Sequence, residues 1–166
     1  MLIREIQPLD AEKFICLIKQ VESEAKFMLM EARERKTTPE QQRKQLEHIK
    51  RQSNSTIFVA EQEKGELVGY LIAIGGSVKR TKHSAYLVVG ILEKYRGRGI
   101  GTSLFQRLEE WARNSNISRL ELTVVTQNEA GISLYQKSGF EIEGIKRNSL
   151  LINDEFYNEY FMSKIF

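Results

Sequence analysis

One segment near the middle of the chain constrains the fold more than any other. The run from Ala85 to Leu92 is apolar on both alternating faces, which is typical of a strand covered on both sides. Glycines then occupy positions 97, 99 and 101, and apolar residues recur at helical spacing from Leu104 to Ala112. The segment therefore predicts a central strand, a tight glycine turn and a helix packed on the sheet.

Patterns on either side predict the remaining elements. Apolar residues at intervals of three or four after Asp10 indicate a helix over residues 10–34, and the capping box TPEQ at 38–41 opens a second helix toward Lys50. Further predicted elements are strands at Thr56 to Glu61, Leu67 to Ile74, Arg119 to Val125, Phe140 to Ile145, Leu150 to Ile152 and Phe156 to Met162, and a short helix at Glu129 to Ser138 that Gly139 ends. This order describes an α/β protein of the mixed α+β kind, with helices packed on a mixed sheet.

Composition narrows the class of protein. The 166 residues, 41% apolar and 28% charged, favour one globular domain over residues 1–166. A single cysteine excludes an internal disulfide, and with only His48 and His83 we expect no metal site. Cys16 has apolar neighbours and is interpreted as a packed thiol. The net charge of +3 is too small for a dedicated nucleic-acid binder but allows a local basic patch.

No apolar stretch approaches the ~20 residues that span a bilayer, and charges occupy the start of the chain where a secretory signal needs an apolar run. The sequence therefore predicts a cytoplasmic protein without a membrane partner.

The glycine turn carries the clearest chemistry. Unpaired amides at a helix N-terminus favour an anion, glycines without side chains let it approach, and two arginines add charge. The turn lacks the Lys-Ser/Thr pair of a Walker loop and has Thr102 where the dinucleotide fingerprint has glycine. Glycines can also serve only to make a tight connection. The candidate binding residues are Arg96, Gly97, Arg98, Gly99, Ile100, Gly101 and Thr102.

Two ordered motifs resemble those of the GNAT superfamily of N-acetyltransferases. Arg96-x-x-Gly99-x-Gly101 after an apolar strand is similar to its acyl-CoA pyrophosphate motif. About 30 residues later, Asn-Glu at 128–129, Leu-Tyr at 134–135 and Ser-Gly-Phe at 138–140 resemble its second signature. The resemblance covers roughly residues 56–162, whereas residues 1–50 match only in being two helices.

The resemblance implies a splayed, mostly antiparallel mixed sheet of about seven strands with helices on both faces. The strands that end near Leu92 and Val125 would part and leave a cleft for pantetheine. Residues 1–55 would form a helical acceptor-side region, and residues 56–166 the acyl-CoA-binding core and terminal hairpin. Backbone of the sheet freed in this way can pair with the amides of pantetheine as an added strand does.

The family also implies roles for individual residues. Arg96 to Thr102 would hold the pyrophosphate of acetyl-CoA, Asn128 would contact the cofactor's arm, and backbone groups at Ile91 would hold pantetheine and meet the oxyanion. Tyr135 would lie near the thioester sulfur and act as general acid. The implied activity is acetyl transfer to a primary amine by direct attack in a ternary complex.

The general base is unassigned. Some members of the family place a glutamate on the strand before the pyrophosphate turn, but Ala85 to Leu92 contains no carboxylate. An ordered water is one alternative. The side-chain candidates are Glu24, Glu31, His83, Asp154, Glu155 and Glu159.

Two other functions and several partners stay open. The missing strand carboxylate favours, as an alternative, a non-catalytic acyl-CoA-binding sensor or regulatory module. A nucleic-acid binder that uses Arg96 and Arg98 is the weaker third hypothesis, and no nucleic-acid partner is expected. The acceptor is predicted to be a small-molecule amine or a peptide N-terminus. A homodimer is common in the family and compatible with the sequence.

Overall fold

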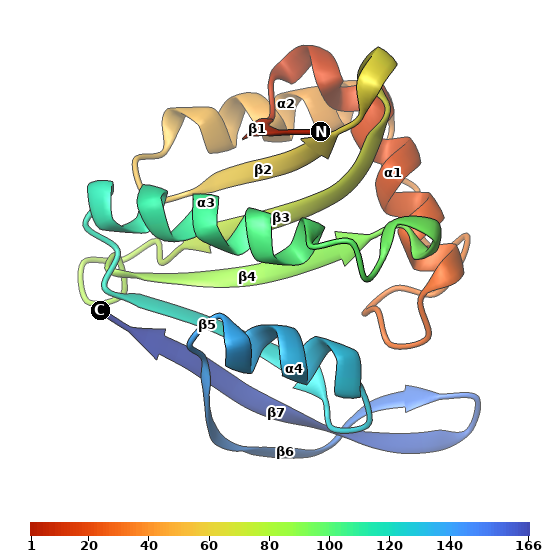
Figure 1. The fold of residues 1–166 in the computed structure, drawn as a ribbon, viewed down its shortest axis with the longest axis vertical. Helices are drawn as coiled ribbons and strands as arrows, with labels where there is room; N and C mark the ends of the chain where they lie inside the picture. The colour runs from red at the N-terminus through yellow and green to blue at the C-terminus, as the bar shows by residue number, and fades with distance from the viewer.

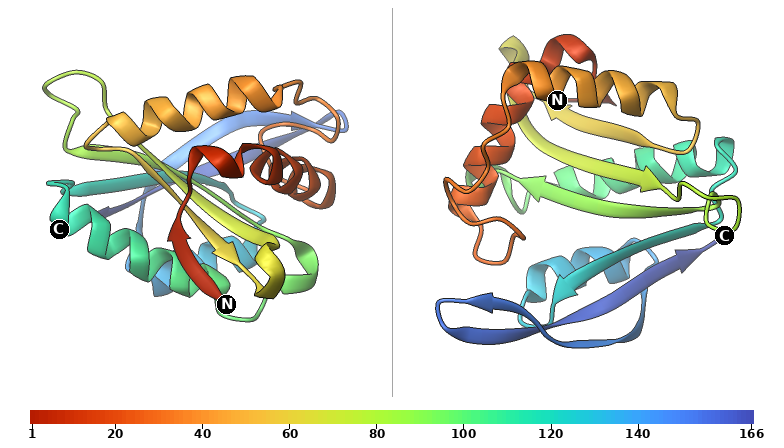
Figure 2. Two further views of the ribbon diagram at one scale, coloured as in Figure 1. Left: turned by 90° about the horizontal axis from the view of Figure 1, so that it is seen from above. Right: turned by 180° about the vertical axis from the view of Figure 1, so that it is seen from behind.

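The computed structural model describes residues 1–166, which form one seven-stranded sheet in the order β1-β2-β3-β4-β5-β7-β6. The strands are β1 (Leu2–Glu5), β2 (Thr56–Glu61), β3 (Leu67–Gly75), β4 (Ser84–Ile91), β5 (Arg119–Val125), β6 (Glu141–Ile152) and β7 (Glu155–Ile165). The helices are α1 (Ala11–Glu24), α2 (Pro39–Arg51), α3 (Ile100–Asn114) and α4 (Glu129–Lys137). α1 and α2 cover one face and α3 and α4 the other, so the predicted architecture is confirmed (Figures 1 and 2). No helix is long and apolar enough to cross a membrane.

The pairing of β4 with β5 distinguishes this sheet from an ordinary one. It is the sheet's one parallel pair, and it contains only three residue pairs, from Ser84↔Arg119 to Tyr86↔Glu121. From Leu87 onward β4 continues without a partner on that side, and the two strands diverge toward their carboxyl ends (Figure 1). The splayed sheet that we expected is therefore present.

Both faces of β3 and β4 are covered, as the apolar run predicts. On one face Phe14 of α1 packs edge-to-face on Tyr70 of β3, with ring centroids 5.7 Å apart. On the other face Leu104 and Leu108 of α3 are fully buried. These residues belong to a single cluster of 31 buried residues that joins α1, α2, α3 and the sheet.

The first helix is shorter than predicted. It ends at Glu24, because Ala25 adopts extended backbone (φ −89°, ψ 136°), whereas the apolar spacing predicts a helix to residue 34. Met28 still packs against the core, but from the loop. The ring of Phe27 lies 5.6 Å from that of Tyr157 on β7, which a continuing helix would not allow. Contacts across the fold thus outweigh the local helical pattern.

The structure differs from the sequence prediction at three further places. Cys16 is exposed, because Phe14, Leu17 and Ile18 take the buried face of α1 and position 16 points away from it. β1 was not predicted, since its arginine and glutamate hide a short edge strand. The two short strands expected at 140–152 are one strand, β6, which bends at two register shifts.

We predict that Gly90→Ala destabilises the protein by about 1–3 kcal/mol. A Cβ at Gly90 would lie 2.6 Å from two ring carbons of the buried Tyr70, so the core must move to admit it. Urea unfolding measures the effect. The matched control is Gly144→Ala, where a Cβ meets nothing within 4 Å, and we expect it to be neutral or stabilising. Equal stability of the two variants would contradict the prediction.

Candidate active site

The glycine turn forms a nest of backbone amides at the start of α3. Gly97 (φ +71°) and Gly99 (φ +81°) adopt left-handed backbone, and a Cβ at either would meet nothing within 4 Å. The Gly99 carbonyl accepts the first helical hydrogen bond, from the Ser103 N–H at 3.0 Å, so the amides of residues 100–102 have no acceptor within the helix. Amides that are free in this way, at the positive end of a helix, suit a diphosphate.

The third glycine of the turn has another purpose. We expected Gly101 to let an anion approach, but a Cβ there would lie 2.7 Å from the Leu134 side chain of α4. The absence of a side chain at this position allows α3 and α4 to pack closely. Gly101 therefore fixes the distance between the turn and the helix that carries Tyr135.

Two arginines flank the turn, and both are exposed. The guanidinium of Arg98 stacks over the Tyr95 ring, 5.3 Å from its centroid. The Nε of Arg96 donates to the Ile91 carbonyl at 3.1 Å. The first turn of α3 contains no acidic residue, so no carboxylate of the helix opposes an anion at the nest.

The free edge of β4 leads from the gap between the strands to the turn. The Leu92 N–H donates to the Val68 carbonyl on the β3 side at 3.0 Å. Because successive residues of a strand face opposite neighbours, Ile91, Val89 and Leu87 direct their backbone groups toward β5. β5 has already parted there, and the Ile91 N–H consequently points into the gap.

Tyr135 approaches this gap from the α3 and α4 side. Its half-buried ring packs edge-to-face on Phe105 and Phe140, with centroids 5.7 and 6.4 Å away. Burial raises the pKa of Tyr135 to about 12, with a smaller contribution from Tyr86. The hydroxyl makes no hydrogen bond within the protein and is not sealed from solvent, so it remains a neutral donor without a partner.

Two tyrosines border the gap from the opposite face. Tyr70 faces α1, where it contacts Phe14. Tyr86 of β4 pairs with Ile74 of β3, which lies four residues from Tyr70 and so on the same face of the sheet. Tyr86 therefore faces α1 as well. The Tyr86 hydroxyl lies 2.8 Å from that of Thr123, just beyond the last pair of β4 and β5. This contact joins the strands where they begin to separate.

Asn128 lies at the start of α4, beyond the end of β5. Its Oδ1 accepts from the Gly131 N–H at 3.0 Å and caps the helix, while its amide group makes no hydrogen bond to protein. The side chain thus fixes the helix that carries Tyr135 and keeps two donors free.

The structure separates the candidate bases. Glu24 accepts a hydrogen bond from the Glu93 N–H at 2.7 Å and anchors α1 to the segment after β4. His83 precedes β4 and so lies at the end of that strand opposite Ile91. Glu31 and Asp154 are exposed, and Glu155 accepts from the Tyr157 hydroxyl at 3.1 Å.

Glu159 has the most suitable placement. It is half-buried on β7 and pairs with Val125, the last residue of β5. Two positions along β7, Tyr157 contacts the loop after α1, so Glu159 faces the α1 side of the sheet. The Ser149 hydroxyl donates to Glu159 Oε1 at 2.8 Å, which leaves Oε2 free.

Sequence reasoning missed one buried ion pair. Glu22 of α1 is only 5% exposed, and Arg35 donates to both its carboxylate oxygens, at 2.8 and 3.1 Å. Glu22 follows Ile15 and Ile18 at helical spacing. A charged residue that continues a row of apolar side chains is the sequence signal that could have indicated a buried ion pair.

Comparisons with known proteins agree with this arrangement. Residues 19–140 match the model of the acetyltransferase (GNAT) family. The L-amino acid N-acetyltransferase AaaT of Escherichia coli is 31% identical over 61% of this chain and 63% of its own length. A crystal structure of a GNAT-family acetyltransferase from Streptococcus pneumoniae superposes with a TM-score of 0.96 at 32% identity, covering 99% of both chains. A ribosomal-protein-alanine N-acetyltransferase from Brucella melitensis gives 0.86 at 27% identity over both full chains.

A nest of helix-end amides next to a free strand edge is an arrangement that suits an acyl-CoA molecule. Because the family model matches residues 19–140, which are most of this chain, the chain belongs to the GNAT acetyltransferase family.

We predict that Tyr135→Phe changes the free energy of unfolding by less than about 0.5 kcal/mol. The ring contacts persist in phenylalanine, and the hydroxyl has no partner to lose. Urea unfolding of the coenzyme-free protein measures this. A loss well above 1 kcal/mol would show that the hydroxyl is part of the core and not free for chemistry.

Proposed function

We propose that the protein transfers an acetyl group from acetyl-CoA to a primary amine by direct attack in a ternary complex. The observation that carries the proposal is the separation of β4 from β5 after three pairs, which leaves a free edge of β4 that leads to the amide nest at Gly99. A free strand edge can bind a chain of amides, and the nest can bind a diphosphate. Coenzyme A joins these two groups in one molecule.

The cosubstrate would lie along β4 on the α3 side of the sheet. Its pyrophosphate would contact residues 96–102, its pantetheine amides the edge from Leu87 to Ile91, and its arm the free amide group of Asn128. Within one domain of residues 1–166, residues 56–166 would then form the acyl-CoA-binding core. Residues 1–55 would line the acceptor side, because α1 and α2 cover the opposite face.

Each chemical step has a group at hand. The amine nitrogen attacks the acetyl carbonyl, and the Ile91 N–H, which points into the gap, stabilises the developing oxyanion. The C–S bond then breaks, and the neutral Tyr135 hydroxyl donates its proton to the departing thiolate. The second proton, which the attacking nitrogen loses as it becomes an amide, restores the Tyr135 hydroxyl. Because burial raises the pKa of Tyr135 to about 12, the phenol is protonated at neutral pH.

Glu159 completes the proton balance. A primary ammonium has a pKa near ~10.4 and must lose a proton before it attacks. Three features of Glu159 support its role as the general base. It lies on β7 opposite Val125, the last residue of β5, it faces the α1 side of the sheet, and its Oε2 makes no hydrogen bond.

The descriptions of two relatives support a proposal for the acceptor class. One relative is described as an L-amino acid N-acetyltransferase and one as a ribosomal-protein-alanine N-acetyltransferase. We propose an acceptor of this range, a small-molecule amine or a peptide N-terminus.

We predict that Tyr135→Phe lowers kcat about a hundredfold and leaves the KM for acetyl-CoA nearly unchanged, since the hydroxyl acts only as the sulfur departs. The assay is thiol release from acetyl-CoA with an amine panel. Tyr160→Phe on β7 is the matched control, and we expect its kcat to be that of wild type. Coenzyme binding without thiol release from any amine would favour the sensor instead.

We predict that Glu159→Gln shifts the rise of kcat with pH upward, toward the pKa of the free ammonium, because bulk solvent must then take the proton. At pH 7 the rate should fall at least tenfold and recover in part at pH 9 to 10. Glu155→Gln at the same hairpin should leave the profile in place. If both profiles matched wild type, Glu159 would not be the base.

A further inference from the structure

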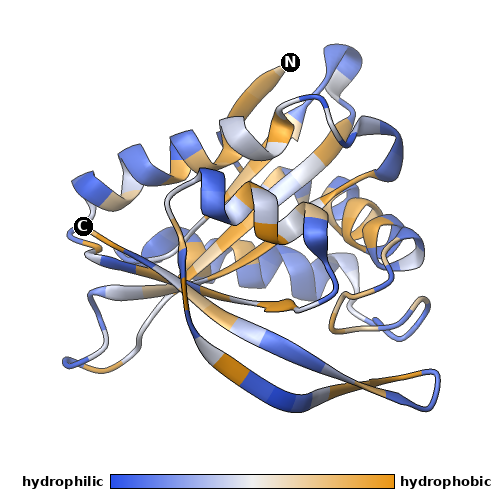
Figure 3. Ribbon diagram, turned by 60° about the horizontal axis from the view of Figure 1, so that its bottom comes forward, coloured by the Kyte–Doolittle hydropathy of each residue, from blue (hydrophilic) through white to orange (hydrophobic).

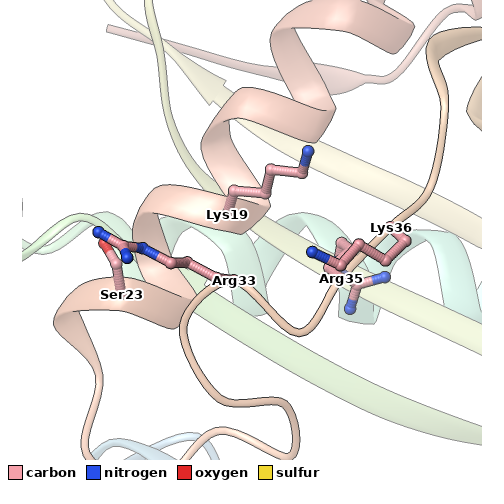
Figure 4. Close-up of a pocket in the computed structure, with 5 residues that line it drawn as sticks. All are labelled: Lys19, Ser23, Arg33, Arg35 and Lys36. Carbon is pink, nitrogen blue, oxygen red and sulfur yellow. The ribbon is translucent and has the colours of Figure 1, made fainter.

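A pocket rich in positive charge lies on the acceptor side of the sheet. It encloses about 480 Å³ between the last turns of α1 and the loop that follows. We call this site the loop pocket. It is lined by Lys19, Ser23, Arg33, Arg35 and Lys36 (Figure 4). No carboxylate lines it, although the same loop carries Glu31 and Glu34.

The charges of the loop pocket are mostly unpaired. Many cations elsewhere in the protein, such as Arg4, Arg119 and Lys164, have carboxylate partners within 3 Å. Lys19, Arg33 and Lys36 make neither an ion pair nor a side-chain hydrogen bond (Figure 4 shows all five side chains). Cations that line one concave site without carboxylate partners raise the local concentration of anions.

The buried ion pair holds this loop in position. Arg35 uses Nε and one terminal nitrogen to bind Glu22, which is nearly inaccessible to water. Removing Arg35 would leave the buried Glu22 charge uncompensated, so the contact resists opening. At the other end, Thr38 and Gln41 form a reciprocal capping box that begins α2. The backbone at Lys36, between these two anchors, is therefore held in place before any ligand arrives.

The loop pocket also adjoins the gap. The last turn of α1, which bears Ser23, lies at the carboxyl end of β4, because Glu24 accepts from the Glu93 N–H at 2.7 Å. The charges of Glu22 and Arg35 act on the pKa of Tyr70 in opposite directions while burial raises it, and the Tyr70 ring covers Gly90, beside the last residue of β4. Arg35, which lines the loop pocket and binds Glu22 of α1, therefore lies on the α1 side of the sheet, and α3 covers the other side (Figure 2).

We infer that the loop pocket binds an anionic group, a carboxylate or a phosphate, carried by the acceptor amine. The inference rests on the proposed acetyl transfer and specifies its substrate class: molecules that contain both a primary amine and a negative charge. With the amine at the gap, the anion would reach Lys36, Lys19 and the free terminal nitrogen of Arg35. Neutral amines lack the group that the pocket is built to hold.

Matched acceptor pairs test the inference. The twenty common L-amino acids are compared with their amides, and O-phosphoethanolamine with ethanolamine, by thiol release from acetyl-CoA. We expect kcat/KM for the anionic member of the best pair to exceed that of its neutral partner at least tenfold, and to fall with salt. The first set identifies a carboxylate and the second a phosphate as the preferred group. Equal use of both members of every pair would overturn the inference while leaving acetyl transfer intact.

Variants assign the preference to this pocket. In the double variant Lys19→Gln/Lys36→Gln, we expect KM for the anionic acceptor to rise about tenfold, with kcat and the rate on its neutral partner unchanged. Lys44→Gln/Lys79→Gln removes the same charge from exposed positions outside the pocket and should have no effect. Parallel losses on charged and neutral acceptors would contradict a specific anion site.

A binding measurement keeps the inference testable if no amine reacts. O-phosphoethanolamine is titrated into the coenzyme-bound protein by calorimetry. Salt-sensitive binding that the Lys19→Gln/Lys36→Gln variant loses would support the pocket even though the proposed function had failed. Absence of binding by wild type, with no charged acceptor preferred in the rate assay, would refute it.

Discussion

A parallel pair of strands that separates after three residue pairs leaves backbone donors and acceptors unused, and such groups are costly when buried without partners. In this protein the β4 groups that face β5 lack a strand partner at Leu87, at Val89 and at the Ile91 N–H, whereas the Ile91 carbonyl accepts from Arg96. Apolar packing on both faces of β4 holds the strand in place although this edge is unpaired. In the proposed function, the bound cosubstrate would satisfy these groups.

Contacts on both faces of the sheet hold the residues around this edge in place. Tyr86 and Thr123 join the strands where they part, and the rings of Phe105 and Phe140 hold Tyr135 from the α4 side. In the proposed mechanism, binding and acid catalysis would therefore draw on rigid elements. The proposed acceptor side differs, since it includes a loop anchored by one buried ion pair.

The sequence determines local features well and long-range ones less well. The strand, glycine turn and helix around Gly99 were predictable, because alternation, helical spacing and left-handed glycine are properties of neighbouring residues. The end of α1 was not, because Ala25 turns away to bring Phe27 to Tyr157, a partner 130 residues later in the chain. The pairing of Glu22 with Arg35, the orientation of Glu159 and the packing role of Gly101 also depend on contacts between distant segments. The short edge strand β1 was hidden by its charges.

Because only three residue pairs join β4 to β5, the sheet consists of two nearly separate ladders. One contains β1, β2, β3 and β4, and the other contains β5, β7 and β6. Their coupling relies on α3 and α4 and on contacts such as the one from Lys164 to Glu109, 2.7 Å long. Each ladder can behave as its own cooperative unit, with amide protons that exchange on different timescales. A ligand that lies between the ladders would merge them into one unit, so occupancy would be recorded in the protein's exchange pattern as well as in its turnover.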